Sequence, residues 1–278
     1  MFEEWLKRLL ESKKSISIDS IIVRSSSNIV DTEIRQFPYN IRIHQSKIVN
    51  MKVLLLSNSG EPIYGWCKKD IAKFCRDNKE LTFISAATVY SSKEYFEKAK
   101  KSLEEVGLNL THLNLDKNPI EQVNNAKALI VGGGNSYQLI KKLSENNLLS
   151  AIKKKVLDGV PYIGLSAGAN ITGPNILTTN DWNVLGSTHF DGLNIVPFNI
   201  NPHYNAPKDK VLSSAETRDE RIKEYLVFNK NPVVALEEQT LLRIENDKIE
   251  IGGNGKVKLF LANQEPKEFK SGETLSLT

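Results

Sequence analysis

The residues with the clearest chemical potential lie where a predicted strand turns into a predicted helix. An apolar run over 162–165 leads into the pattern Gly164-x-Ser166-x-Gly168, followed by further small residues. A serine at such a bend needs small neighbours, because the backbone is strained and the helix packs close to the strand. The bend exposes the hydroxyl at the carboxyl end of the sheet and points backbone N–H groups at a developing oxyanion. The pattern predicts Ser166 as a nucleophile, with an ordinary tight turn as the alternative.

Three consecutive glycines follow a second apolar run. The run 128–131 continues into residues 132–135, which read Gly-Gly-Gly-Asn. A dinucleotide-binding fingerprint would need glycine at Tyr137, and a P-loop would need Gly-Lys-Ser/Thr, so neither phosphate site is indicated. Two interpretations stay open, a flexible turn and a second wall of an oxyanion hole.

A serine nucleophile requires a base, and a histidine is the usual one. The sequence has four histidines. His44 lies in the N-terminal segment, and His112 lies in an apolar strand, where a structural role is favoured. His189 follows a flexible Gly-Ser-Thr segment, whereas His203 follows a short strand that Pro202 ends. A rigidly held imidazole at a sheet edge makes His203 the preferred base.

The imidazole in turn needs an acid to fix its tautomer and to stabilise its positive charge. Glu237 and Glu238 follow the apolar strand 233–236. Because side chains alternate along a strand, one carboxylate faces the site and the other faces solvent, and the pattern leaves open which. The chain order Ser, His, Glu also differs from the order of α/β-hydrolases.

These residues are carried by a regular alternation of strands and helices that begins at Met51. Parallel strands require such helical crossovers, so the sequence predicts an α/β fold with a mainly parallel central sheet flanked by helices and a β-rich C-terminal end. The expected strands are 53–56, 81–85, 108–115, 128–131, 162–165, 233–236, 241–244, 248–251 and 256–261, and the expected helices are 66–76, one ending at Gly107, 136–143, 148–157 and one capped by Thr217 and Glu220.

Length and composition set the domain organisation. The chain has 278 residues, 37 basic and 33 acidic side chains and 40% hydrophobic residues, which is ordinary for a folded α/β protein. Residues 1–50 differ from the rest and form an N-terminal extension of unknown role, and residues 51–278 form one domain. Disordered, collagen-like and disulfide-rich proteins are excluded.

The composition also predicts few partners beyond a small substrate. The basic residues are scattered, so no nucleic-acid surface is expected. Cys67 and Cys75 are eight residues apart, which suits neither a CxxC pair nor a zinc site, so we expect no metal and no cofactor. No signal peptide and no apolar run of about 20 residues is found, so we expect a cytoplasmic protein without a membrane partner.

From about Met51 to Glu238 the chain resembles peptidase E, the α-aspartyl dipeptidase family of serine peptidases. Six blocks in the same order carry the resemblance: Leu54-Leu55-Leu56-Ser57-Asn58-Ser59, Val131-Gly132-Gly133-Gly134-Asn135, Ile163-Gly164 with Ser166-Ala167-Gly168-Ala169-Asn170, Thr178-Thr179-Asn180-Asp181, Ile200-Asn201-Pro202-His203 and Glu216-Thr217-Arg218. The resemblance implies a class I glutamine-amidotransferase-like fold, a flavodoxin-like three-layer sandwich.

The resemblance also implies roles for individual residues. Ser166 is the nucleophile, His203 the general base and Glu238 the orienting acid. The backbone N–H groups of Gly133, Gly134 and Ala167 would form the oxyanion hole.

The expected substrate has an N-terminal aspartate. Asp181 would meet its amino group, Arg218 would bind its side chain bidentately, and Asn135 is counted with the substrate-binding residues. Alternatively, Asp181 caps a turn and Arg218 pairs with acids on its own helix. The sequence departs from the family around the acid, where Glu237 replaces a proline and Gln239-Thr240 replaces Gly-Asn.

The expected activity is therefore a metal-independent serine dipeptidase that cleaves Asp-X dipeptides through an acyl-enzyme intermediate. A cyanophycinase-like hydrolase of aspartyl polymers and a catalytically silent binding module on the same fold are the alternatives. The residue preferred after aspartate and the oligomeric state stay open.

Overall fold

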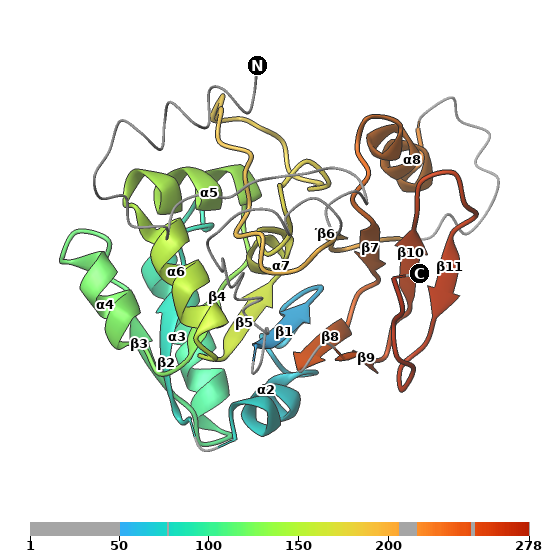
Figure 1. Ribbon diagram of the computed structural model, residues 1–278. Coiled ribbons are helices and arrows are strands. Elements are labelled where there is room, and N and C mark those ends of the chain that lie inside the picture. Colours follow the sequence, from blue (N-terminus) through green and yellow to red (C-terminus); the bar gives the residue numbers. More distant parts are fainter. Residues whose placement is uncertain (1–50, 77, 206–215, 246–247, 278) are drawn as a thin grey trace, which may run out of the picture. The chain divides into compact units, whose positions relative to one another are not determined.

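The computed structural model describes residues 51–76, 78–205, 216–245 and 248–277 (Figure 1). The N-terminal extension 1–50, with His44, and the predicted turn 246–247 lie outside these residues. The domain boundary at Met51 therefore stays a prediction.

Strands and helices alternate along the described chain. The strands are β1 (Lys52–Leu56), β2 (Glu80–Ile84), β3 (Asn109–His112), β4 (Leu129–Val131), β5 (Tyr162–Leu165), β6 (Asn199–Asn201), β7 (Val233–Leu236), β8 (Thr240–Glu245), β9 (Lys248–Gly253), β10 (Val257–Phe260) and β11 (Lys267–Phe269). The helices are α2 (Lys68–Cys75), α3 (Ser92–Glu104), α4 (Pro119–Asn125), α5 (Ser136–Glu145), α6 (Leu148–Leu157), α7 (Ala167–Asn170) and α8 (Arg218–Phe228).

The larger sheet has seven strands in the order β3-β2-β4-β5-β1-β8-β9. The five strands from β3 to β1 are parallel, β8 pairs antiparallel with β1, and β9 pairs antiparallel with β8. Parallel neighbours end at the same edge, so the loops after β4 and β5 lie side by side. This edge carries the triple glycine and the serine bend.

Helices cover both faces of this sheet. In β1, Val53 and Leu55 belong to one apolar core with residues of α4, α5 and α6, whereas Leu54 and Leu56 belong to a second core with residues of α2 and α3. Strands buried on both faces are expected to be apolar throughout, as β1, β4 and β5 are. The arrangement is the predicted three-layer sandwich (Figure 1), and the predicted fold class is confirmed.

A smaller sheet of four strands, in the order β11-β10-β7-β6, forms the β-rich C-terminal part. Strands β6 and β7 are parallel, with Asn201 opposite Ala235, so the segments that follow them emerge side by side. Helix α8 packs on one face of this sheet through Ile222 and Tyr225. The other face joins the first apolar core through Val234 and Leu236.

Three elements differ from the sequence-based prediction. Strand β3 ends at His112 rather than residue 115, because the chain then leaves the sheet and Gln122 hydrogen-bonds both backbone groups of Asn114. Helix α4, which was not predicted, begins at Pro119 and buries one residue, Val123. Strand β11 was also missed, because its residues are mostly exposed.

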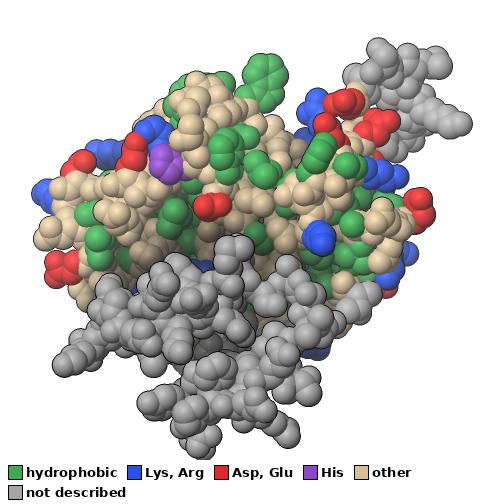
Figure 2. Space-filling model, turned by 45° about the horizontal axis from the view of Figure 1, so that its top comes forward, with side chains coloured by type: hydrophobic (Ala, Val, Ile, Leu, Met, Phe, Trp, Pro, Cys, Tyr) green, Lys and Arg blue, Asp and Glu red, His purple; other side chains and the backbone are tan. Residues whose placement is uncertain are grey.

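The surface carries mixed charge. On the face drawn in Figure 2, the Lys and Arg side chains of the described residues lie scattered among Asp and Glu side chains. None of the described helices combines the length and the apolar character that crossing a membrane requires.

Candidate active site

The serine bend joins β5 to the short helix α7. Ser166 has φ 50° and ψ −107°, a conformation that few residues other than glycine adopt. The backbones approach so closely that a Cβ on Gly164 would lie 2.4 Å from the carbonyl oxygen of Gly168, and one on Gly168 2.2 Å from that of Val131. The small residues of the pattern are therefore required by the bend, as predicted.

Three side chains form a continuous hydrogen-bonded chain. The hydroxyl Oγ of Ser166 lies 2.8 Å from Nε2 of His203, and Nδ1 of His203 lies 2.7 Å from Oε1 of Glu238. Ser166 follows β5 of the large sheet, whereas His203 and Glu238 follow the parallel strands β6 and β7 of the small sheet. The fold thus joins residues that are 37 and 35 positions apart in the sequence.

The backbone around His203 is held on both sides. The side-chain amide of Asn180 donates to the carbonyl of Pro202 at 2.6 Å, and the backbone N–H of Tyr204 donates to the carbonyl of Leu236 at 2.9 Å. His203 itself has φ 54°, so these two contacts hold an unfavourable backbone conformation. The backbone that carries the imidazole is thus held at the end of β6, where the sequence predicted the base.

The two adjacent glutamates have different partners. Glu238 contacts His203, whereas the carboxylate of Glu237 accepts a hydrogen bond of 2.9 Å from the backbone N–H of Lys256. The alternation expected after β7 is present, and it directs Glu238 toward the imidazole.

The glycine segment faces the serine across a cavity of about 490 Å³, whose lining includes Gly133, Gly134, Asn135, Ser166 and His203. The backbone N–H groups of Gly134 and Ala167 have no hydrogen-bond partner among the described residues. The N–H of Gly133 donates instead to the hydroxyl of Tyr95 at 3.2 Å. Within the described chain, two of the three predicted oxyanion donors are thus available, and the third is engaged.

Asn135 has a structural contribution in this conformation. Its Oδ1 caps α5 by accepting from the N–H of Gln138 at 3.1 Å, and its Nδ2 donates to the carbonyl of Trp182 at 3.0 Å. It lines the serine cavity, but both polar atoms of its side chain are engaged.

Asp181 and Arg218 lie together around a smaller cavity of about 130 Å³. Asp181 accepts through Oδ2 from the N–H of Ser136 at 2.7 Å and from the hydroxyl of Thr179 at 3.0 Å. Its Oδ1 makes no hydrogen bond within the described chain. The carboxylate therefore stabilises the start of α5 and still has one oxygen available.

The guanidinium of Arg218 forms no salt bridge with a described carboxylate, although the negative charge of Glu238 acts on it. It donates a hydrogen bond of 3.4 Å to the carbonyl of Pro202, next to His203. The nearby Glu216 forms a salt bridge with Arg221 instead, at 3.7 Å. Burial, followed by the like charge of Arg221, lowers the pKa of Arg218, and the charge of Glu238 opposes this shift by raising it. Pairing with acids on its own helix is thus not observed for Arg218.

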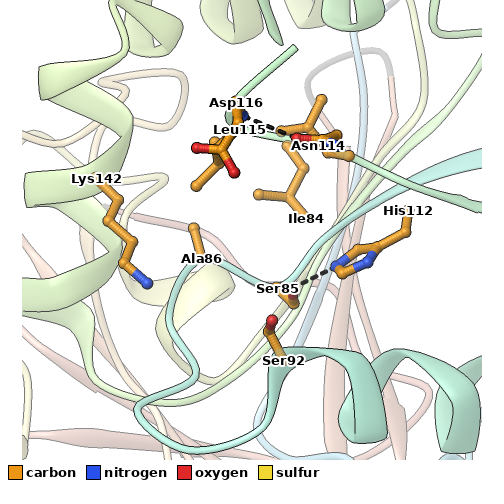
Figure 3. A pocket seen from close by; sticks show the side chains of 10 residues that line it. Ile84, Ser85, Ala86, Ser92, His112, Asn114, Leu115, Asp116 and Lys142 are labelled. Carbon is orange, nitrogen blue, oxygen red and sulfur yellow. Dashed lines mark hydrogen bonds between the residues drawn. The ribbon is translucent and has the colours of Figure 1, made fainter.

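A second Ser–His contact lies in another cavity of about 410 Å³ at the end of β2 and β3 (Figure 3). Ser85 Oγ lies 2.6 Å from Nε2 of His112, whose ring stacks on Phe96 at 4.5 Å. Burial lowers the pKa of His112, and its Nδ1 has no carboxylate partner in the described part of the chain. This pair lacks the third member of a triad, which agrees with a structural role for His112.

The remaining sequence candidates lie elsewhere. His189 is not among the residues that line the serine cavity. Both cysteines are unpaired and buried, and burial raises the pKa of Cys67 to about 12 and that of Cys75 to about 11. The described residues contain no group of three or more His, Cys, Asp or Glu side chains placed to hold a metal ion.

Sequence reasoning missed Tyr95, Val89 and Tyr90, which also line the serine cavity. Tyr95 stands in the first turn of α3, where no motif marks it. Its hydrogen bond to Gly133, 38 positions away, depends on the packing of α3 beside the sheet.

The chain matches the model of peptidase family S51 over residues 53–252. Peptidase E of Nostoc sp. is 38% identical over 235 residues, which cover 82% of this chain and 96% of the relative. Peptidase E of Streptomyces coelicolor is 34% identical over 229 residues, covering 81% and 94%. The crystal structure of a peptidase from an acI-B1 Actinobacterium aligns with a TM-score of 0.65 at 19% identity, covering 83% of this chain and 98% of that one.

Proposed function

The chain belongs to peptidase family S51 and is a serine-type dipeptidase, and we propose that it hydrolyses dipeptides with an N-terminal aspartate through an acyl-enzyme intermediate. The hydrogen-bonded chain Ser166–His203–Glu238 supports the covalent mechanism. The aspartate preference is supported by Arg218, which lines the same cavity as Asp181 and forms no salt bridge with a described carboxylate.

In this mechanism Oγ of Ser166 attacks the scissile carbonyl carbon while Nε2 of His203 accepts the hydroxyl proton. Glu238 stabilises the imidazolium and keeps Nδ1 protonated. The N–H groups of Gly134 and Ala167 stabilise the oxyanion of the tetrahedral intermediate.

Collapse of the intermediate breaks the C–N bond, and the imidazolium gives its proton to the leaving amine. Water, deprotonated by His203, then attacks the ester carbonyl of the acyl-enzyme. The second collapse restores the Ser166 hydroxyl and releases aspartate.

Charge supports the choice of aspartate at the N-terminus. A half-buried guanidinium that forms no salt bridge with a described carboxylate can bind an anion, and it can bind a side-chain carboxylate bidentately. The free Oδ1 of Asp181 is available to the substrate ammonium group. The two cavities lie next to each other in the fold, since Asp181 contacts Ser136, which follows Asn135, and Arg218 contacts Pro202, which precedes His203.

A dipeptide panel tests the substrate. We expect Asp-Leu to be cleaved with a higher kcat/KM than Asn-Leu, Glu-Leu, Leu-Leu or Lys-Leu, with Ser166→Ala as the blank. Arg218→Gln should lower kcat/KM for Asp-Leu by about 10- to 100-fold, the value of a charged hydrogen bond, and change Asn-Leu much less. Lys223→Gln, an exposed position on the same helix, is the matched control.

Faster cleavage of Leu-Leu or Lys-Leu than of Asp-Leu would reject the aspartate site. An equal effect of Arg218→Gln on every dipeptide would show that Arg218 supports the fold rather than the substrate. An aspartyl polymer in the same panel tests the alternative polymer hydrolase. A burst of p-nitroaniline from aspartyl p-nitroanilide tests the acyl-enzyme, because a burst requires that deacylation follow a faster acylation.

A further inference from the structure

Two tyrosines meet at the edge of the serine cavity. Their hydroxyl oxygens lie 3.2 Å apart, one on Tyr64 in the segment after β1 and one on Tyr95 in the first turn of α3. Tyr64 is completely buried, whereas Tyr95 lines the cavity that Ser166 also lines. The ring of Tyr95 is held edge-on by Phe83, with the ring centres 5.4 Å apart.

The donors and acceptors around the two hydroxyl groups determine which way each hydroxyl proton points. The N–H of Gly133 can only donate, so it uses one lone pair of the Tyr95 oxygen. The hydroxyl of Tyr64 has no other hydrogen-bond partner in the described chain, so its proton would be buried and unpaired if Tyr95 donated to it. A buried donor without an acceptor is strongly unfavourable, so Tyr64 donates to Tyr95.

Tyr95 therefore accepts two hydrogen bonds, and its own proton has no acceptor among the described residues. Burial raises the pKa of both tyrosines, so both hydroxyls are protonated at neutral pH. Tyr95 is among the residues that line the serine cavity, so a group bound in that cavity can supply the missing acceptor.

Gly133 is a close neighbour of both this hydroxyl and the nucleophile. Its N–H contacts Tyr95, and a Cβ built on it would lie 3.2 Å from Cβ and 3.7 Å from Oγ of Ser166. The Tyr95 hydroxyl is thus on the glycine side of Ser166, where the oxyanion forms. It also accepts the hydrogen bond of the Gly133 N–H, which the family resemblance had assigned to the oxyanion.

We propose that Tyr95 is a catalytic residue whose hydroxyl donates a hydrogen bond to the oxyanion of the tetrahedral intermediate. The N–H groups of Gly134 and Ala167 donate to the same oxyanion. The inference rests on the proposed acyl-enzyme mechanism. The two hydrogen bonds that Tyr95 accepts polarise its O–H group and make it a stronger donor. The proton stays on the phenol throughout.

The test compares a transition-state analogue with a product. An aspartyl aldehyde forms a tetrahedral adduct with Ser166 and so presents an oxyanion, whereas free aspartate does not. We expect Tyr95→Phe to lower kcat and to weaken the binding of the aldehyde by about 10²-fold, which is the usual effect of one oxyanion donor. KM and the affinity for free aspartate should stay unchanged. Tyr137→Phe, which lies outside the serine cavity and packs on Phe190, is the matched control.

Three outcomes would overturn the proposal. The aldehyde could bind Tyr95→Phe as tightly as the wild type, or aldehyde and aspartate could weaken equally, which is the result of a purely structural change. If Tyr95→Phe does not fold, 3-fluorotyrosine at position 95 keeps the ring shape and improves the donor. The aldehyde should then bind at least as tightly as to the wild type, and weaker binding contradicts the proposal.

The same experiment separates the two proposals. A wild-type enzyme without a burst and without an aldehyde adduct rejects the acyl-enzyme mechanism. If the wild type forms the adduct and the adduct is equally stable in Tyr95→Phe, only the role of Tyr95 is rejected.

Discussion

The hydrogen bond between His203 and Glu238 is short but open to water. The two side chains are 39% and 46% exposed, so solvent screens the charge–charge attraction. What this bond supplies is chiefly orientation, because a carboxylate on Nδ1 fixes the tautomer in which Nε2 can accept the serine proton.

Replacing Glu238 tests that orientation. Glu238→Gln keeps the shape of the side chain, but its amide can donate to Nδ1 and so favour the unproductive tautomer. We expect kcat to fall by about 10²-fold, less than for a buried triad acid because water can substitute here. Steady-state kinetics with Asp-Leu measure the effect.

Glu237→Gln is the matched control, because Glu237 contacts the backbone of Lys256 rather than the imidazole. It should leave kcat unchanged. A larger loss in Glu237→Gln than in Glu238→Gln would reverse the assignment of the acid.

The thiols of Cys67 and Cys75 are expected to be unreactive in the folded protein. Burial raises the pKa of Cys67 to about 12, so at pH 8 only about one molecule in ten thousand carries that thiolate, the reactive form. Cys75, with a pKa of about 11, is also protected. We expect no reaction of the native protein with Ellman's reagent at pH 8 and the release of two equivalents after unfolding in guanidinium. Rapid modification of one thiol in the native protein would show that its helix opens readily.

At the scale of elements, the sequence predicted those parts whose burial leaves a periodic pattern. Strands β1, β4 and β5 are buried on both faces and read as apolar runs, and α3 and α5 show one apolar stripe each. Strand β11 has no such pattern, because it lies at the sheet edge and its only strand partner in the described sheet is β10. Its existence depends on a tertiary neighbour.

The active-site residues divide in the same way, into those that leave a pattern in the sequence and those whose place depends on tertiary packing. Ser166 could be identified because its bend imposes small residues at fixed spacing. The strand pattern alone left the choice between Glu237 and Glu238 open, because the choice depends on the pairing of β7 with β6. Only the family resemblance pointed to Glu238. The engagement of Gly133 by Tyr95 was also beyond the sequence, since it arises from helix packing.

The close contact at Gly168 gives a prediction for the bend as an element. In Gly168→Ala the new methyl would lie 2.2 Å from the carbonyl oxygen of Val131, so β4 and α7 must move apart. We expect the free energy of unfolding to fall by about 1–3 kcal/mol, as in other overpacked cores, and kcat to fall with it. Urea denaturation and kinetics on the same samples measure both.

Gly107→Ala separates strain from function. Gly107 has φ 76°, and a methyl group added there would meet no atom within 4 Å, so alanine adds backbone strain far from the serine. It should cost about 1–2 kcal/mol of unfolding free energy and leave kcat unchanged. Full activity in Gly168→Ala would show that the bend tolerates displacement of α7.

At the scale of the whole described domain, the two sheets act as one support. Leu236 of β7 and Val257 of β10 belong to the same apolar core as Leu242 of β8. The nucleophile on one sheet and its base and acid on the other therefore share a packed interior, which keeps them in register. The matched family region ends at residue 252, but β10 pairs with β7 beyond that point and so supports Glu238.

The N-terminal extension, residues 1–50, is expected to be dispensable for catalysis. Every contact described for the site comes from Met51 or later, and the family match begins at residue 53. The Nostoc relative is aligned over 96% of its own length while only 82% of this chain is used. We therefore expect a chain that begins at Met51 to equal the full chain in kcat/KM for Asp-Leu and in melting temperature, with Ser166→Ala in the shortened chain as the blank. If the shortened chain keeps its circular dichroism spectrum and melting temperature but loses activity, the extension takes part in catalysis or substrate binding, because the fold that holds Ser166, His203 and Glu238 would still be intact.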